Sequence, residues 1–170
     1  MSQKYTYMEI IGRFYPDVGC HLEGEDNVYE DIVYDYGSSI PAKLELETKM
    51  LEALRSDLWE NIKVERERRK DTGGYKVGNY WYHSDTTSRI QQVALVMLGA
   101  NMPSNILWKT MSGAFVPMTP TLAAQIFQAA MVSDTIIFAT AEQKRAAMLA
   151  SADPANYDYL SGWPKIYGEE

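Results

Sequence analysis

The chain is poor in the side chains that most often carry chemistry. Its 170 residues include one cysteine, Cys20, and two histidines, His21 and His83. A single cysteine cannot form an internal disulfide. The sequence has no Cys-x-x-Cys, no His-Glu-x-x-His and no loop with the spacing of a calcium site. We therefore expect no disulfide within the chain and no bound metal.

Glycine-rich phosphate loops and excess basic charge are missing as well. The eleven glycines form no Gly-x-Gly-x-x-Gly pattern and no loop that ends in Lys-Ser or Lys-Thr, so no nucleotide cofactor is expected. The 16 basic residues are outnumbered by 23 acidic ones, which gives a net charge of -7. Because nucleic-acid-binding proteins need positive charge to neutralise phosphates, we expect no nucleic-acid partner.

Long hydrophobic runs are also absent. No uninterrupted apolar run approaches the roughly 18 residues of a membrane span, so we expect no membrane contact. The start, MSQKYTYMEI, lacks the basic stretch and apolar segment of a secretory signal. Hydrophobic residues make up 46% and charged residues 23%, as in ordinary globular proteins. These properties predict a protein that folds in the cytoplasm.

The first forty residues are rich in aromatic and acidic side chains. YMEIIGRFY (7–15) predicts a short helix that ends before Pro16. CHLEGEDNVYEDIVYDYG (20–37) predicts two short strands with GEDN at the turn. Tyr29 and Tyr34 in this segment suit either a half-buried sheet face or an aromatic binding surface. We interpret residues 1–40 as a small leader with a strand pair, a candidate docking arm.

A long helix is predicted to begin at Pro41, because proline is tolerated in a first helical turn. An apolar stripe follows helical spacing at Leu44, Leu51, Leu54, Leu58 and Ile62. The basic segment KVERERRK (63–70) then indicates either a solvated last turn that suits the helix dipole or a basic patch for an acidic partner. Met50 and Trp59 lie off the stripe. They predict a second contact face, toward another helix or toward a second copy of the chain.

Two hairpins are predicted in the rest of the chain, at about 74–83 and 106–117. The first has Gly78-Asn79 as its two-residue turn. The second has Ser112-Gly113 at its turn and carries Trp108 and Phe115 in its arms.

Two further helices complete the predicted domain of residues 41–170. One follows the first hairpin, with an apolar face formed by Ile90, Val93, Ala94, Met97 and Leu98. The other begins at Thr119 as N-cap and Pro120. Its predicted buried face consists of Leu122, Ile126, Ala130, Ile137, Phe138 and Ala141. The expected fold class is α+β, mostly helical, with two or three small antiparallel β-hairpins packed on long helices.

The stretch WYHSD places His83, Ser84 and Asp85 side by side. Neighbouring residues of a strand point to opposite faces, so adjacency alone cannot form a catalytic triad. The stretch also lacks the glycine-flanked turn and backbone donors that surround a serine nucleophile. Ser84 or Asp85 instead suits the N-cap of the following helix. We therefore predict capping, and no enzyme.

Several long phrases give the chain a family resemblance. They are, in order, IKVERERRKDTGGYKVGNYWYHSD, SRIQQ, WKTMSGAFVPMTPTLAAQIFQAA, IFATAEQKRAAM and YDYLSGWP. From about residue 59 to 167 the chain thereby resembles a domain of unknown function that recurs in tailed-bacteriophage tail-fibre and fibre-assembly proteins. The resemblance implies a virion-related role and no enzymatic activity, and it brings no catalytic residues. Family members often carry a histidine near Lys144, which is absent here.

Two hypotheses follow from this resemblance. In the first, the protein is a chaperone-like assembly protein in the host cytoplasm that binds a tail-fibre protein. Its contact residues are then expected on the long helix, at Met50 and Trp59, and on the second hairpin, at Trp108 and Phe115. In the second, it is a structural component of the phage tail or baseplate that attaches the fibre, with the leader as docking arm through Tyr29 and Tyr34.

Two further alternatives stay open. The long helix offers a surface for self-association. An enzyme, for example a hydrolase acting on the host surface, would need a strongly perturbed acid or nucleophile in a cleft, and the sequence favours no residue for that role.

Overall fold

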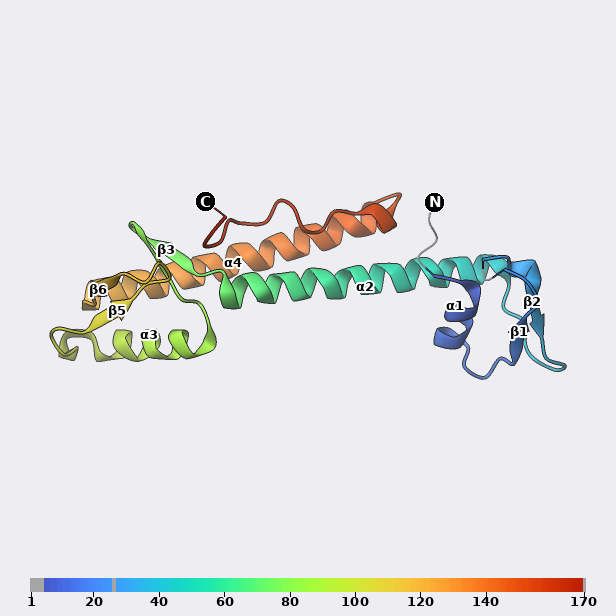
Figure 1. Ribbon diagram of the computed structural model, residues 1–170, viewed down its shortest axis with the longest axis horizontal. Coiled ribbons are helices and arrows are strands. Elements are labelled where there is room, and N and C mark those ends of the chain that lie inside the picture. Colours follow the sequence, from blue (N-terminus) through green and yellow to red (C-terminus); the bar gives the residue numbers. More distant parts are fainter. Residues whose placement is uncertain (1–4, 26, 170) are drawn as a thin grey trace. The chain divides into compact units, whose positions relative to one another are not determined.

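The computed structural model describes residues 5–25 and 27–169. Over these residues the protein is 55% helical, with four α-helices and three antiparallel two-stranded sheets (Figure 1), which confirms the predicted α+β class. The elements follow the chain as α1 (Tyr7–Phe14), β1 (Cys20–Leu22), η1 (Tyr29–Asp31), β2 (Ile32–Tyr34), α2 (Lys43–Thr72), β3 (Tyr75–Val77), β4 (Tyr80–Tyr82), α3 (Thr86–Leu98), η2 (Gly99–Asn101), β5 (Leu107–Lys109), β6 (Phe115–Pro117), α4 (Pro120–Ala150) and η3 (Pro154–Asn156).

The chain forms two compact units. Unit 1 comprises residues 1–60 and 147–159, and unit 2 comprises residues 61–146 and 160–170. Both long helices, α2 and α4, therefore contribute residues to each unit. This division differs from the predicted one, because unit 1 takes in the first half of α2 together with the leader.

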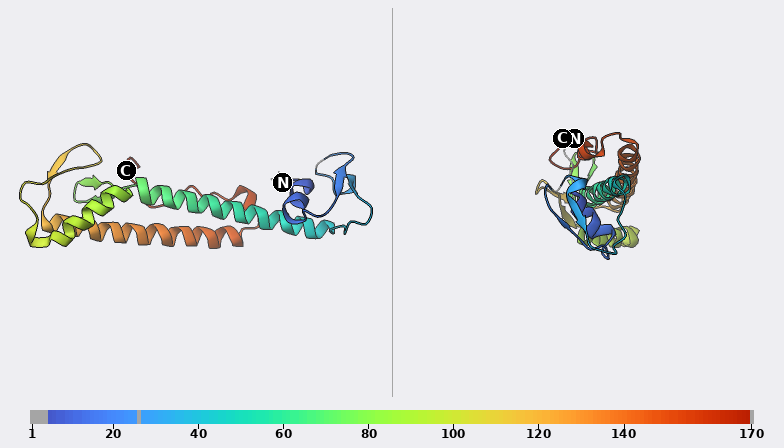
Figure 2. Two further views of the ribbon diagram at one scale, coloured as in Figure 1. Left: turned by 90° about the horizontal axis from the view of Figure 1, so that it is seen from below. Right: turned by 90° about the vertical axis from the view of Figure 1, so that its right-hand side faces the viewer.

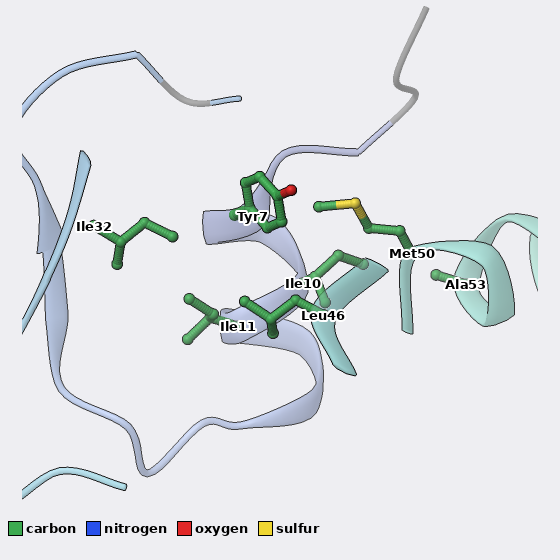
Figure 3. Close-up of a cluster of buried hydrophobic side chains, with 7 residues drawn as sticks. All are labelled: Tyr7, Ile10, Ile11, Ile32, Leu46, Met50 and Ala53. Atoms are coloured by element: carbon green, nitrogen blue, oxygen red, sulfur yellow. The ribbon is translucent and has the colours of Figure 1, made fainter. Parts of the chain in front are cut away.

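The core of unit 1 is formed where α1 packs on α2. A capping box begins α1: the Thr6 hydroxyl accepts a hydrogen bond from the Glu9 amide (3.2 Å), and the Glu9 carboxylate accepts one from the Thr6 amide (2.7 Å). Figure 3 shows the buried side chains that meet here, namely Tyr7, Ile10, Ile11, Ile32, Leu46, Met50 and Ala53.

Two predictions for this region need correction. Leu44 is exposed, whereas Met50 is buried against α1. The predicted second face of the long helix therefore exists, but a helix of the same chain covers it. The predicted GEDN turn includes Asp26, which lies outside the described residues. Residues Tyr29–Asp31 form a 3-10 helix, so the second strand begins only at Ile32.

Unit 2 gathers two hairpins and α3 around the first half of α4 (Figure 2). Strands β3 and β4 pair around the turn at Gly78, whose φ of 60° favours glycine. Helix α4 begins as predicted, since the Thr119 hydroxyl accepts a hydrogen bond from the Leu122 amide (3.1 Å). The buried cluster consists of Tyr75, Tyr82, Val116, Met118, Ala123, Ile126 and Ala130.

The charged end of α2 is partly buried, contrary to both predicted alternatives. Arg69 is 6% exposed and pairs with the buried Glu65 (2.6 Å) and with Glu169 (2.9 Å). Its guanidinium also donates a hydrogen bond to the Pro164 carbonyl (2.9 Å). The C-terminal segment thus packs onto the basic turns, which spacing along α2 alone could not indicate. The ion pairs with Arg68 and Arg69 lower the pKa of Glu65.

Candidate interaction surface

Each of the residues His83, Ser84 and Asp85 in the WYHSD stretch makes a hydrogen bond that supports the fold. The Asp85 carboxylate caps α3 by accepting hydrogen bonds from the Ser88 amide (3.0 Å) and hydroxyl (2.6 Å). The buried Ser84 hydroxyl accepts one from the Gly74 amide (2.9 Å). The His83 carbonyl accepts one from the Gln92 side chain (2.9 Å). The capping prediction is therefore confirmed for Asp85, and Ser84 instead joins the strand to the preceding loop.

Asp85 and Tyr75, which lie in and beside this stretch, have shifted pKa values. The hydrogen bonds from Ser88 hold the pKa of Asp85 below its usual value. Burial raises the pKa of Tyr75 to about 12, and its hydroxyl donates a hydrogen bond to Gln92. Elsewhere, burial raises the pKa of the Cys20 thiol. No group of three His, Cys, Asp or Glu side chains within residues 5–25 and 27–169 is placed to hold a metal ion.

The outer face of α3, formed by Ile90, Val93, Ala94, Met97 and Leu98, is exposed. Met97 is 82% and Ile90 65% exposed, so the apolar face that helical spacing predicts lies on the outer side of α3. Helix α3 packs instead through Gln92, with Leu95 and Val96 partly buried beside it. Gln92 determines this orientation, because it receives the Tyr75 hydroxyl bond and donates to the His83 carbonyl. The face left outside carries no charged residue.

Helix α4 also exposes apolar side chains in unit 2, at Phe127, Met131, Val132, Ile136 and Phe138. Phe138, predicted to be buried, is 41% exposed and lies under the Arg66 guanidinium, 4.5 Å from the ring centre. By length and composition alone, α4 is long and apolar enough to cross a membrane. It is the single such helix in the described part of the chain. Only 22% of its most apolar window is buried. Core helices of soluble proteins pass the same test, but they are usually more deeply covered.

The hairpin of β5 and β6 adds two more exposed apolar residues. Leu107 is 60% and Phe115 63% exposed, on the hairpin face opposite to the half-buried Trp108. A groove of about 600 Å³ lies between α3 and β5. It is lined by His83, Ser88, Gln91, Ala94, Leu95, Ile106, Leu107, Trp108 and Lys109. Its apolar residues come from both elements.

The six residues predicted to contact a partner have different environments. Phe115 is exposed, and Met50 is part of the core of unit 1, where it is closed to a partner. Trp108 is half-buried against the core of unit 2, and Trp59 is half-buried beside Leu58 and Met148. The remaining two, Tyr29 and Tyr34, are half-buried in the leader.

Of these two, Tyr34 lies on a half-buried face of β2, whereas Tyr29 is half-buried in the 3-10 helix that precedes it. The Tyr29 hydroxyl donates a hydrogen bond to the Pro41 carbonyl (2.8 Å), and its ring meets Tyr7 edge to face. Burial raises the pKa of Tyr34 to about 12. Sequence reasoning missed the exposed faces of α3 and α4. The sequence did hold a signal for the exposed face of α4, namely apolar residues on all sides of the helix. Such a helix needs more than one neighbouring element to bury its apolar surface.

Taken together, these features define a mostly helical α+β protein with an exposed apolar surface in unit 2. The chain belongs to the family described as Domain of unknown function (DUF4376), whose model matches residues 53–161. The match spans most of unit 2 and, in unit 1, residues 53–60 of α2 and the segment 147–159. No curated protein and no solved structure matches the chain significantly.

Proposed function

We propose that the protein is a bacteriophage tail-fibre-associated assembly protein that binds a fibre protein through unit 2. The outer face of α3 is the observation that carries the proposal. Contiguous apolar surface on a soluble protein marks a binding site for another macromolecule. The face has no charged residue, so binding there gains free energy mainly by removing apolar area from water.

The bacteriophage context rests on the family phrases of the sequence. Phage fibres are trimeric, slow to fold and rich in exposed strand edges. Such intermediates aggregate when their apolar surface is uncovered. A small protein with net charge -7 remains soluble while its apolar face covers that surface.

The alternative is a structural component of the phage tail or baseplate, found in the virion. It needs the leader as a docking arm. The leader instead packs its side chains on α2 through Tyr7, Ile10 and Ile11. This packing favours a protein with its own complete fold that acts in the host cytoplasm during assembly.

Site-specific photo-crosslinking tests the contact. A photo-crosslinking residue replaces Met97, and a matched control carries it at the exposed Gln143 of α4. In infected cells we expect a crosslink from position 97 to a fibre subunit and none from position 143. A crosslink to other proteins only, or none at position 97, would contradict the proposal.

Quantitative mass spectrometry of purified particles separates the two roles. An assembly protein is abundant in the infected-cell lysate and absent from finished particles. A fixed stoichiometry close to that of the fibre or baseplate would instead make the protein a tail component.

A further inference from the structure

The groove between α3 and β5 is lined on the hairpin side by Ile106, Leu107, Trp108 and Lys109, which include all of β5. The Thr110 amide donates to the Ala114 carbonyl (2.8 Å), and the Met118 amide donates to the Ile106 carbonyl (2.8 Å). In an antiparallel pair, residues whose backbone groups bond to the neighbouring strand alternate with residues whose backbone groups point away from it. Ile106 and Thr110 bond to the β6 side, so the backbone groups of Leu107 and Lys109 point away from β6. Among residues 5–25 and 27–169, β5 pairs with β6 alone. Its outer edge therefore offers two amides and two carbonyls.

The other edge of the hairpin is closed to strand addition by its sequence. The outward positions of β6 are Phe115 and Pro117. Proline has no amide hydrogen, so β6 offers one outward donor where β5 offers two. Proteins use edge prolines to prevent strand pairing. The hairpin thus leaves one edge suited to an added strand, and this edge borders the groove.

The side chains of the groove specify what such a strand would carry. Ala94 and Leu95 of α3, together with Ile106 and Trp108, give the groove an apolar lining that comes from two separate segments of the chain. Lys109 is the one lysine or arginine of the lining, and none of the lining residues is acidic. An acidic residue directly opposite Lys109 on an added strand would therefore form a favourable cross-strand pair.

We propose that this groove binds an extended segment of the partner protein, which joins β5 as a third strand. This inference rests on the proposed function and names the chemistry of its partner. Apolar side chains of the segment enter the groove at alternate positions, and an acidic side chain lies beside Lys109. Main-chain hydrogen bonds to Leu107 and Lys109 supply affinity, and the alternating side chains supply specificity.

A second copy of this chain fits the edge less well. If two β5 edges paired about Trp108, each Leu107 would face the Lys109 of the other copy. That pairing gives neither lysine a counter-charge, whereas an acidic segment does. Two chains of net charge -7 also repel each other.

Selection from a cell-surface library of random peptides of about twelve residues tests the proposal, with the full chain as target. We expect binders that alternate apolar residues and contain an acidic one. Binding should weaken at least about tenfold, or by about 1.4 kcal/mol, for Leu107→Pro, which blocks the edge, and for Ala94→Arg, which fills the groove. Phe115→Ala, on the opposite edge of the hairpin, is the matched control and should bind as the wild type does.

Amide hydrogen exchange locates the bound peptide. The Leu107 and Lys109 amides should gain protection when peptide binds, whereas the Trp108 amide, already bonded to β6, should change little. Three results would overturn the proposal. The selection could give no binder, both groove variants could bind as the wild type does, or the free chain could form a dimer that Leu107→Pro dissociates. If position 97 still crosslinks to a fibre subunit in that case, the groove inference fails alone. If peptides bind but no fibre crosslink forms, the proposed function fails alone.

Discussion

Arg89 at the start of α3 forms a bidentate ion pair with Asp134 in the middle of α4. Its Nη1 lies 2.6 Å from Oδ2, and its Nη2 lies 2.9 Å from Oδ1. The same guanidinium donates to the Ser84 carbonyl (2.5 Å) and to the Lys70 carbonyl (2.8 Å). One side chain therefore joins the end of α2, the exit of β4, α3 and α4. Together with Gln92, it fixes the orientation in which α3 presents its outer face.

Removing the carboxylate should destabilise unit 2 measurably. We expect Asp134→Asn to lower the free energy of unfolding by about 1–3 kcal/mol, because the partly buried guanidinium loses its directly bonded carboxylate. Urea unfolding measures the change. Glu142→Gln is the control, since its pair with Arg145 is long (3.7 Å) and exposed. It should change the stability by less than about 0.5 kcal/mol. Equal effects would refute the joining role of Arg89.

Asp85 should make the stability depend on pH in the acid range. Its pKa is lowered in the folded state, so its charge contributes stability above the ordinary value of 3.8, and this contribution is lost as the pH falls through the folded-state pKa. Asp85→Asn keeps a good N-cap without the charge and should flatten the stability curve below about pH 4. Asp85→Ala removes the cap and should cost about 1 kcal/mol at neutral pH. Unfolding curves over a pH series measure both, and identical acid limbs for wild type and Asp85→Asn would contradict the assignment.

Ser84 and His83 should respond differently to alanine, although they are neighbours. Ser84→Ala leaves the buried Gly74 amide without its acceptor and should cost about 1–3 kcal/mol. His83→Ala removes only a half-buried ring, because the carbonyl that Gln92 uses remains. We expect the free energy of unfolding to change by less than about 0.5 kcal/mol, and partner binding to persist because eight other residues of the groove lining remain. Complete loss of function in a folded, stable His83→Ala variant would favour the enzyme hypothesis instead.

The sequence predicted elements better than it predicted the faces they bury. Turn residues and caps act locally, so Gly78-Asn79, Thr119 and Asp85 indicated their elements correctly. Which side of α3 is buried depends on Gln92 and its two partners, which are distant in sequence. An apolar stripe at helical spacing shows that a face needs cover, but not whether the same chain provides it.

The long helix α2 illustrates the same limit. Its buried stripe includes Leu46, Met50 and Ala53 rather than Leu44, because α1 supplies a neighbour there. Further along, Glu65 and Arg69 continue the buried side as an ion pair. A pattern search for apolar residues ends at Ile62, whereas the packing continues beyond it. Candidate contact residues chosen as exceptions to the stripe, such as Met50, were consequently drawn from the core.

Charge on the outer face of α3 should leave folding unaffected. We expect Ile90→Glu and Met97→Glu to change the free energy of unfolding by less than about 0.5 kcal/mol, because both side chains are largely exposed. The control is Ile126→Glu, which places a charge in the core of unit 2 and should prevent stable folding. Thermal unfolding distinguishes the three variants. A large loss of stability for Met97→Glu would show that the face packs within the chain.

Helix α4 should not insert into membranes, although its length and composition would permit it. Its buried side includes Ile126 and Ile137, and insertion would remove both from their packing in unit 2. It would also carry Asp134 into the bilayer and separate it from Arg89, which costs several kcal/mol. We therefore expect the full chain to stay in the dense fractions when it is floated with vesicles of zwitterionic lipid, and likewise with anionic lipid. If the full chain instead floats with the vesicles, and Val132→Glu abolishes this flotation without loss of stability, the exposed side of α4 binds a lipid surface.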